Sequence, residues 1–129
     1  MREANFRAGW RYIIETVESC QLTRYRKGGF YGFHSDGHGD HLSAYKDPDR
    51  SWLDGYVRKL SMTIVLNDNF EGGAFEFATL TGDECFITPL SPKAGTVLVF
   101  PSYLDHRVVP VIKGVRYSLT TWFLGPPFV

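Results

Sequence analysis

The feature that most constrains the fold is a run of short strand-like stretches after residue 20. In each stretch apolar residues alternate with polar ones, and glycine, proline or asparagine separates it from the next. No second helical pattern follows residue 20, which argues against alternating β/α architecture. About eight short strands between residues 22 and 125 predict a mainly β sandwich or jelly roll whose two sheets enclose a pocket. The predicted strands are Leu22–Tyr25, Tyr31–Asp36, Lys59–Leu66, Ala74–Ala78, Glu84–Pro89, Thr96–Pro101, His106–Pro110 and Val115–Phe123.

The beginning of the chain predicts one helix, over about residues 2–20. Its apolar residues recur at the spacing of an amphipathic helix, and they are Phe6, Trp10, Ile13, Ile14 and Val17. We expect this helix to support the sheets through its apolar stripe. Cys20 continues the stripe, so we expect it to pack in the core. Cys20 and Cys85 are expected to be free thiols, although a disulfide between them stays open.

Length and charge limit the class of protein. The 129 residues form a single domain, 1–129, and 14 basic against 14 acidic residues give no net charge. This balance lacks the basic footprint of a nucleic-acid-binding protein. We interpret the cluster of Arg24, Arg26 and Lys27 as a solvated strand edge. Because we find no signal peptide and no apolar run of membrane length, we expect a cytoplasmic monomer that does not contact a membrane.

Residues 37–58 interrupt the strand pattern with a long, polar, glycine-bearing stretch. Loops of this length are uncommon in compact domains and are usually lids, binding loops or insertions. The stretch begins directly after Asp36, a candidate metal ligand. We therefore predict a mobile lid over the pocket, and a purely structural excursion is the alternative.

His34 and Asp36 are candidate metal ligands two positions apart in a strand. Side chains alternate across a strand, so these two lie on the same face. His106, at the start of a later strand, is the candidate third ligand. Two imidazoles and one carboxylate leave other coordination positions open, which suits Fe(II) chemistry with dioxygen. A structural zinc site would fill four positions, usually with thiolates, and no cysteine is placed for it.

Two other histidines, His38 and His41, compete for the role of ligand. They lie in the glycine-rich part of residues 37–58, where the backbone offers no fixed geometry. We interpret them as surface residues or as contacts for a substrate. For His106 the alternative role is an ordinary core histidine. The presence of His34 and Asp36 favours the role of metal ligand instead.

The last predicted strand separates into two faces. One carries Val115, Tyr117, Leu119, Thr121 and Phe123, and the other carries Arg116, Ser118, Thr120 and Trp122. An inward-facing arginine needs an anionic partner, because an unpaired buried charge costs several kcal/mol. The guanidinium fork matches a carboxylate, so Arg116 predicts a small carboxylate ligand near the metal. An ordinary ion pair with Glu71, Glu76 or Asp83 is the alternative.

Four segments together resemble the prolyl-4-hydroxylase-like family of Fe(II)- and 2-oxoglutarate-dependent oxygenases. The resemblance runs from about Leu22 to Gly125, and the combination of motifs at these spacings is specific. The segments are Tyr25-x-x-Gly28-x-x-Tyr31-x-x-His34-x-Asp36, Arg58–Asn67 with Phe70–Phe75, Ala94–Pro101 leading to His106, and Lys113–Trp122.

The resemblance implies a double-stranded β-helix, a cupin-like jelly roll with the metal inside. It places iron at His34, Asp36 and His106, and the C5 carboxylate of 2-oxoglutarate at Arg116. By position, the residues expected to line the cosubstrate pocket are Tyr25, Thr120 and Trp122.

Two positions depart from relatives in the family. Collagen-type members have lysine where this chain has Arg116, so the match is closer to the branch with arginine. Animal oxygen-sensing members have a tyrosine near the position of Val65, and valine offers no hydroxyl for the carboxylate. Thr63, Thr120 or Tyr25 are the candidates to replace that hydroxyl.

The resemblance implies hydroxylation of a C–H bond, with 2-oxoglutarate and dioxygen as cosubstrates and succinate and carbon dioxide as products. Ascorbate is a further candidate cofactor. Peptidyl proline is the first expected substrate, and Tyr31, Trp52 and Tyr103 are candidate aromatic contacts for its ring. The same chemistry on a free amino acid or other small molecule is one alternative. A non-catalytic, cupin-like metal-binding module is the alternative from another class.

Overall fold

The computed structural model describes residues 1–129 and contains one short α-helix, two 3₁₀ helices and eleven strands. The helices are α1 (Arg2–Arg7), η1 (His41–Ser43) and η2 (Pro48–Leu53). The strands are β1 (Thr16–Val17), β2 (Gln21–Tyr25), β3 (Tyr31–His34), β4 (Val57–Val65), β5 (Glu71–Gly72), β6 (Phe75–Thr81), β7 (Glu84–Leu90), β8 (Val97–Pro101), β9 (Asp105–Val108), β10 (Val111–Lys113) and β11 (Arg116–Gly125).

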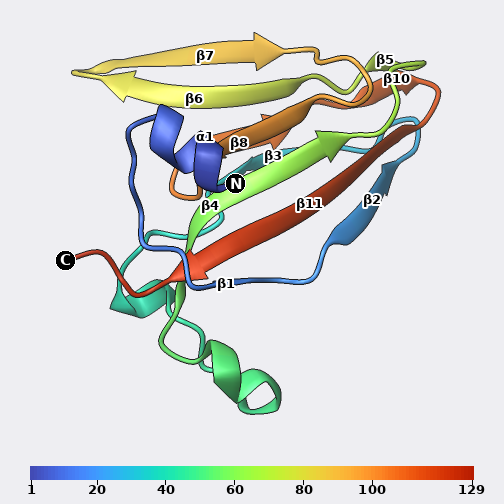
Figure 1. Cartoon of the computed structure of the whole chain (residues 1–129). Helices are drawn as coiled ribbons and strands as arrows, with labels where there is room; N and C mark the ends of the chain where they lie inside the picture. Colours follow the sequence, from blue (N-terminus) through green and yellow to red (C-terminus); the bar gives the residue numbers. More distant parts are fainter.

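Two antiparallel sheets form a sandwich (Figure 1). The larger sheet has the strand order β1-β11-β4-β8, and β2 also pairs with β11. The smaller sheet has the order β3-β9-β6-β7, and β10 pairs with β5 as a separate two-stranded ribbon. The predicted mainly β sandwich is therefore confirmed.

The eight predicted strands are all present, with ends shifted by a few residues. β4 and β11 lie side by side at the centre of the larger sheet (Figure 1) and are buried at most positions. Three further strands were not predicted: β1, β5 and β10. Each is only two or three residues long, too short to show an alternating pattern.

The predicted helix over residues 2–20 is wrong beyond its first turns. α1 ends at Arg7, and Gly9 and Arg11 then take positive φ angles of 75° and 53° that end the helical geometry. The following residues are extended, and the N–H groups of Glu15 and Glu18 donate to carbonyls of β11. These hydrogen bonds to β11 satisfy backbone groups that a helix would satisfy internally. Pairing with β11 therefore decides the structure here, although the apolar residues recur at helical spacing. Cys20 is exposed, so its predicted core role is also wrong.

Residues 37–58 contain both 3₁₀ helices and are anchored to the sandwich. Leu53 is 1% exposed and packs against Trp122 and Leu124 of β11. Near the start of the segment, the Phe128 N–H donates to the Gly39 carbonyl at 2.8 Å. Lid motion in this segment stays a prediction.

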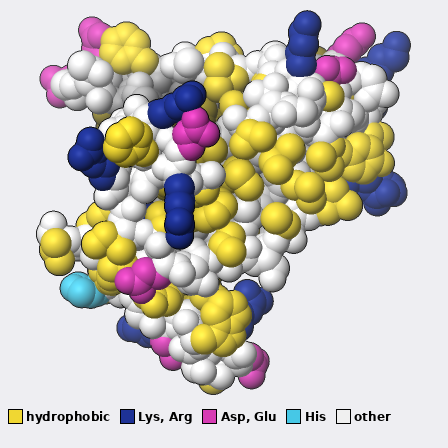
Figure 2. Space-filling model, viewed as in Figure 1, with side chains coloured by type: hydrophobic (Ala, Val, Ile, Leu, Met, Phe, Trp, Pro, Cys, Tyr) yellow, Lys and Arg dark blue, Asp and Glu magenta, His cyan; other side chains and the backbone are white.

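The hydrophobic core is divided into two small clusters with a polar region between them. One contains Phe75, Phe100 and Val108, and the other contains Leu53, Trp122 and Leu124. Figure 2 shows further hydrophobic side chains exposed across the face that carries β4 and β11. None of the helices is long and apolar enough to cross a membrane.

Candidate metal centre

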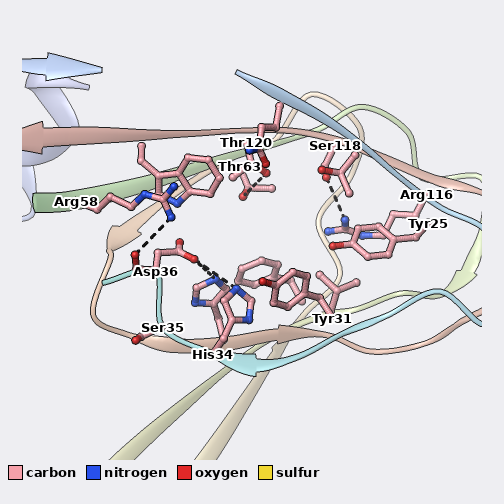
Figure 3. Close-up of a pocket in the computed structure, with 16 residues that line it drawn as sticks. Tyr25, Tyr31, His34, Ser35, Asp36, Arg58, Thr63, Arg116, Ser118 and Thr120 are labelled. Carbon is pink, nitrogen blue, oxygen red and sulfur yellow. Dashed lines mark hydrogen bonds and ion pairs between the residues drawn. The ribbon is translucent and has the colours of Figure 1, made fainter. Parts of the chain in front are cut away.

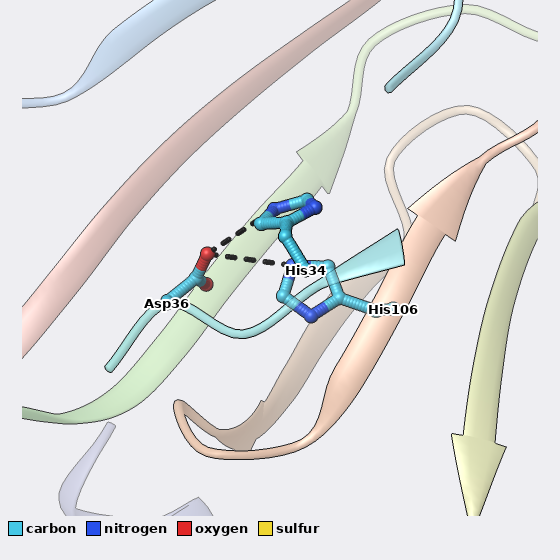
Figure 4. Close-up of side chains that lie close together, drawn as sticks. All are labelled: His34, Asp36 and His106. Carbon is cyan, nitrogen blue, oxygen red and sulfur yellow. Dashed lines mark ion pairs between the residues drawn. The ribbon is translucent and has the colours of Figure 1, made fainter. Parts of the chain in front are cut away.

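The two histidine ligands come from neighbouring strands of the smaller sheet, and the aspartate follows one of them. β3 pairs with β9, and His34 lies directly opposite His106. Asp36 follows β3, and its backbone N–H donates to the Ser102 carbonyl at 2.8 Å. Nε2 of His34 and Nε2 of His106 lie 3.4 and 3.5 Å from Oδ1 of Asp36 (Figure 4). The structure therefore brings together the three side chains that the sequence singled out, as a group able to hold one metal ion.

Each imidazole is oriented by a backbone carbonyl two residues before it in the chain. Nδ1 of His34 lies 2.7 Å from the Gly32 carbonyl, and Nδ1 of His106 lies 2.8 Å from the Leu104 carbonyl. A carbonyl cannot donate, so Nδ1 of each ring carries a proton, and Nε2 is the atom of each ring that faces Asp36 and is available to a metal. With a metal bound, the Nε2 lone pairs of both rings and Oδ1 of Asp36 would face the ion. This donor set fits Fe(II), which accepts two histidines and one carboxylate on one face.

The two rings differ in their surroundings. His106 is 5% exposed, and its ring centre lies 5.4 Å from that of Phe75 and 4.8 Å from that of Phe100. His34 is less buried, and its outer neighbour is the ring of Tyr31 at 3.9 Å between centres. The centre therefore has a closed, apolar side and a side that faces the cavity.

The Asp36 carboxylate is held in its ionised form. Burial raises the pKa of this carboxyl, but hydrogen bonds from His106 and Ser61 outweigh burial and bring the pKa down to about 2. Ser61 Oγ donates to Oδ2 of Asp36 at 2.5 Å. Asp36 therefore offers a negative ligand atom without first losing a proton.

A cavity of about 330 Å³ runs from these ligands into the space between the sheets. His34 and Asp36 lie at one end and Arg116 lies at the other, while Ser118 and Thr120 of β11 line the wall between them (Figure 3). Only 5 of the 16 lining residues are hydrophobic. The cavity therefore suits a small polar ligand.

Arg116 is a buried cation without an anionic partner. It is 2% exposed, its Nε donates to the Gly73 carbonyl at 3.0 Å, and one Nη donates to Ser118 Oγ at 3.3 Å. The alternative of an ion pair is wrong: Glu76 pairs with Arg107, and no carboxylate lies within 4.0 Å of Arg116. Burial lowers the pKa of the Arg116 guanidinium. A bound carboxylate would supply the missing charge.

A glycine makes room for this arginine. Gly73 has φ 62°, and a Cβ at this position would lie 3.1 Å from Cδ of Arg116. A larger residue at position 73 would therefore strain the backbone and crowd Arg116, whose Nε donates to the carbonyl of this same glycine.

The other predicted pocket residues, Tyr25, Thr63, Thr120 and Trp122, also line the cavity. Cζ of Arg116 lies 5.5 Å from the centre of the Tyr25 ring, and burial raises the pKa of the Tyr25 hydroxyl. Thr63 and Thr120 face each other across β4 and β11 with 3.4 Å between their hydroxyls. Nε1 of Trp122 is buried and makes no hydrogen bond of ordinary geometry, although it lies near enough to Asp36 to help lower the pKa of that carboxyl. Their roles toward a cosubstrate stay predictions.

Comparison with known proteins identifies the family. The family model described as the 2OG-Fe(II) oxygenase superfamily, where 2OG is 2-oxoglutarate, matches residues 20–124. The chain belongs to this superfamily. A PKHD-type hydroxylase of Thermosynechococcus vestitus is 40% identical over 107 residues, which cover 78% of this chain and 40% of that protein. A PKHD-type hydroxylase of Xylella fastidiosa strain M12 is 33% identical over 104 residues, which cover 79% of this chain and 42% of that protein. This chain thus spans about two-fifths of the length of these curated relatives.

Solved structures of the superfamily share the fold. A Pseudomonas putida prolyl-4-hydroxylase is 28% identical, with a TM-score of 0.63 over 94% of this chain and 59% of that one. A viral collagen prolyl hydroxylase from Paramecium Bursaria Chlorella virus-1 is 22% identical, with a TM-score of 0.64 over 96% of this chain and 68% of that one. These similarities confirm the predicted double-stranded β-helix.

Of the three predicted substrate contacts, only one lines the cavity. Tyr31 lines the cavity beside His34. Trp52 is 62% exposed in η2, and Tyr103 is 47% exposed in the turn after β8; neither lines the cavity. Their proposed contact with a substrate stays a prediction. His38 is also outside the ligand group, as expected, and so is His41.

Arg58 is a cavity residue that the sequence did not reveal. Its Nε lies 2.6 Å from Oε2 of Glu18, one Nη donates to the Tyr45 hydroxyl at 3.2 Å, and its Cζ lies 3.8 Å above the Trp122 ring. Tyr45 also donates to Glu18. This group, Glu18–Arg58–Tyr45, ties the N-terminal segment, β4 and residues 37–58 together at the edge of the cavity.

A β-bulge explains why Arg58 was missed. Phe123 pairs with Leu60 and Leu124 pairs with Arg58, so Lys59 is an extra residue in β4. Strict alternation from Ser61 would turn Arg58 to the other face of the sheet. A bulge leaves no signal in the alternating pattern.

Proposed function

We propose that this chain is the catalytic domain of a hydroxylase that depends on Fe(II) and 2-oxoglutarate. The observation that carries the proposal is that a metal-type triad and an unpaired, buried guanidinium line the same polar cavity. A metal alone would not need Arg116, and a carboxylate alone would not need the triad. 2-Oxoglutarate needs both, because it has a keto-acid end for a metal and a second carboxylate at the far end.

In this proposal iron and dioxygen supply the oxidation, and the residues of the chain bind and orient the reactants. His34, Asp36 and His106 would hold the metal from one side. Arg116 would bind the C5 carboxylate of 2-oxoglutarate, the end of the molecule that is kept in succinate when carbon dioxide is lost from the other end. Phe75 and Phe100, which pack against the His106 ring, would keep water from that side of the metal.

The proposed substrate is a proline residue in a peptide or protein. Support comes from the similarity to the Pseudomonas putida prolyl-4-hydroxylase, which at 28% identity is a distant relative. Tyr31, about half exposed at the edge of the cavity, offers an aromatic surface to a proline ring. The polar cavity lining favours the second candidate, a free amino acid or other small molecule.

Substrate assays with purified chain test the proposal. The chain is incubated in air with Fe(II), 2-oxoglutarate and ascorbate, together with proline-containing peptides or free proline. We expect succinate release and a gain of one oxygen atom on a peptide, and we expect His106→Ala to abolish both. Oxygen transfer to free proline alone would favour the small-molecule alternative. No succinate release with or without any substrate would contradict the proposal.

A further inference from the structure

The two carboxylate oxygens of Asp36 have different surroundings. Oδ1 lies 3.4 and 3.5 Å from the Nε2 atoms of His34 and His106. Oδ2 points the other way and accepts a hydrogen bond from Ser61 Oγ at 2.5 Å. Ser61 is fully buried in β4 of the larger sheet, whereas the histidines belong to β3 and β9 of the smaller sheet.

The direction of the hydrogen bonds around Ser61 follows from counting hydrogens. Ser61 Oγ also lies 3.0 Å from Ser102 Oγ. An ionised carboxylate only accepts, so the single hydroxyl hydrogen of Ser61 goes to Asp36. Ser102 must then donate its own hydrogen to Ser61. Each hydroxyl donates once, in the order Ser102 to Ser61 to Asp36.

Backbone contacts fix this chain of hydroxyls in place. The carbonyl of Ser102 accepts from the N–H of Asp36 at 2.8 Å, and the N–H of Ser102 donates to the Lys59 carbonyl at 3.0 Å. Ser102 is fully buried, like Ser61. Asp36 is therefore held at its backbone and at Oδ2, and only Oδ1 is left for a metal.

We propose that Ser61 is a positioning residue that keeps Asp36 a ligand through one oxygen. This inference rests on the metal site of the proposed function. An octahedral ion bound by three single-atom ligands has three positions left, which are enough for a bidentate keto acid and dioxygen. If Oδ2 also turned to the metal, one of those positions would be lost. The hydroxyl of Ser61 holds Oδ2 away.

A packing role does not account for this hydroxyl. A methyl group in the same place would fill nearly the same volume between the strands without bringing a polar group into a fully buried site. The contact also goes to the carboxylate oxygen that the histidines do not face. A hydroxyl that only completed hydrogen bonding in the core would have no reason to select this oxygen.

Co(II) is the probe for the test, because its ligand-field spectrum reports the number and kind of ligands. Three variants are compared with the parent chain: Ser61→Ala, Ser61→Thr and Ser102→Ala. We expect Ser61→Ala to bind Co(II) roughly tenfold to a hundredfold more weakly, as when other partners of metal ligands are removed, and to change the spectrum. Ser61→Thr restores the donor and should lie within about threefold of the parent. Ser102→Ala should have a smaller effect than Ser61→Ala, because Ser61 can still donate.

Thr121→Val is the matched control, since it removes another buried hydroxyl that bonds the Glu18 carbonyl and not Asp36. We expect it to leave Co(II) affinity unchanged. The rise in Tm on adding Co(II) separates positioning from folding: in Ser61→Ala this rise should shrink, whatever happens to the Tm of the metal-free chain. An unchanged rise, or Co(II) affinity equal to the parent's, would overturn the role of Ser61. Failure of the parent chain itself to bind Co(II) would instead overturn the proposed function.

Discussion

Two buried charges, Asp36 and Arg116, line one cavity without pairing with each other. Asp36 is surrounded by His34, His106 and Ser61, while Arg116 has only neutral partners. Buried charges are costly unless paired. Each therefore marks the place of an opposite charge: a cation at Asp36 and an anion at Arg116.

Replacing Arg116 should weaken cosubstrate binding without destabilising the metal-free chain. Arg116→Met removes charge-assisted hydrogen bonds of about 1.5–3 kcal/mol each, so the Kd for 2-oxoglutarate should rise by at least about tenfold. The same change removes an unpaired buried charge, so the free energy of unfolding should rise by about 1 kcal/mol. Calorimetric titration and urea unfolding measure the two effects. An unchanged Kd would refute the assignment of Arg116. Arg116→Lys keeps the charge but not the forked guanidinium, so its Kd for 2-oxoglutarate should lie between those of the parent chain and Arg116→Met.

Asp36 should make the stability of the metal-free chain depend on pH in acid. Its folded-state pKa of about 2 is below the ordinary value of 3.8, so its contribution is complete above about pH 4 and is lost as the pH falls toward 2. The shift corresponds to a contribution on the order of 2 kcal/mol. Urea unfolding from pH 5 to about 2 should show this loss in the parent chain and not in Asp36→Asn. Parallel curves for the two proteins would contradict the prediction.

At the scale of elements, β11 organises the site. It pairs with β1, β2 and β4, and its inward face carries Arg116, Ser118, Thr120 and Trp122. Its alternating pattern predicted that face correctly from sequence. The helix over residues 2–20 was predicted wrongly, because the sequence does not show that the edge of β11 is open to pairing. The bulge at Lys59 hid the position of Arg58 for a similar reason. Which residues of β4 lie opposite which residues of β11 depends on both strands, and the sequence of one strand does not show it.

The Glu18–Arg58–Tyr45 group should hold residues 37–58 against the sandwich. Glu18→Gln removes the carboxylate that pairs with Arg58, and we expect a loss of about 2 kcal/mol in the free energy of unfolding. Tyr45→Phe removes one hydroxyl and keeps that ion pair, so it should cost about 1 kcal/mol.

Hydrogen exchange locates the effect of these two variants. In both, the amides of Tyr45 and Gly55, which bond within residues 37–58, should exchange faster than in the parent chain, while β6 and β7 should not change. Faster exchange spread evenly over the whole chain would show that the group supports general stability and does not anchor this segment.

At the scale of the molecule, the sandwich separates two small apolar clusters and leaves a polar cavity between its sheets. The sequence predicted this architecture, since turn residues and alternation recur along most of the chain. It also predicted the ligand triad, although Asp36 lies just past the end of β3 and not within the strand. Ser61 and Glu18 could not be assigned in the same way, since their partners lie 25 and 40 residues away in the chain.

The most direct test of the account is the binding of 2-oxoglutarate without oxygen, measured by calorimetry with and without Fe(II). If the triad and Arg116 bind one molecule from its two ends, 2-oxoglutarate should bind with a stoichiometry of one, and the metal should tighten binding by at least about tenfold. Succinate, which keeps a carboxylate for Arg116 but has no keto group for the metal, should gain much less from Fe(II). Equal affinity for 2-oxoglutarate with and without metal, or no binding in either case, would contradict the account.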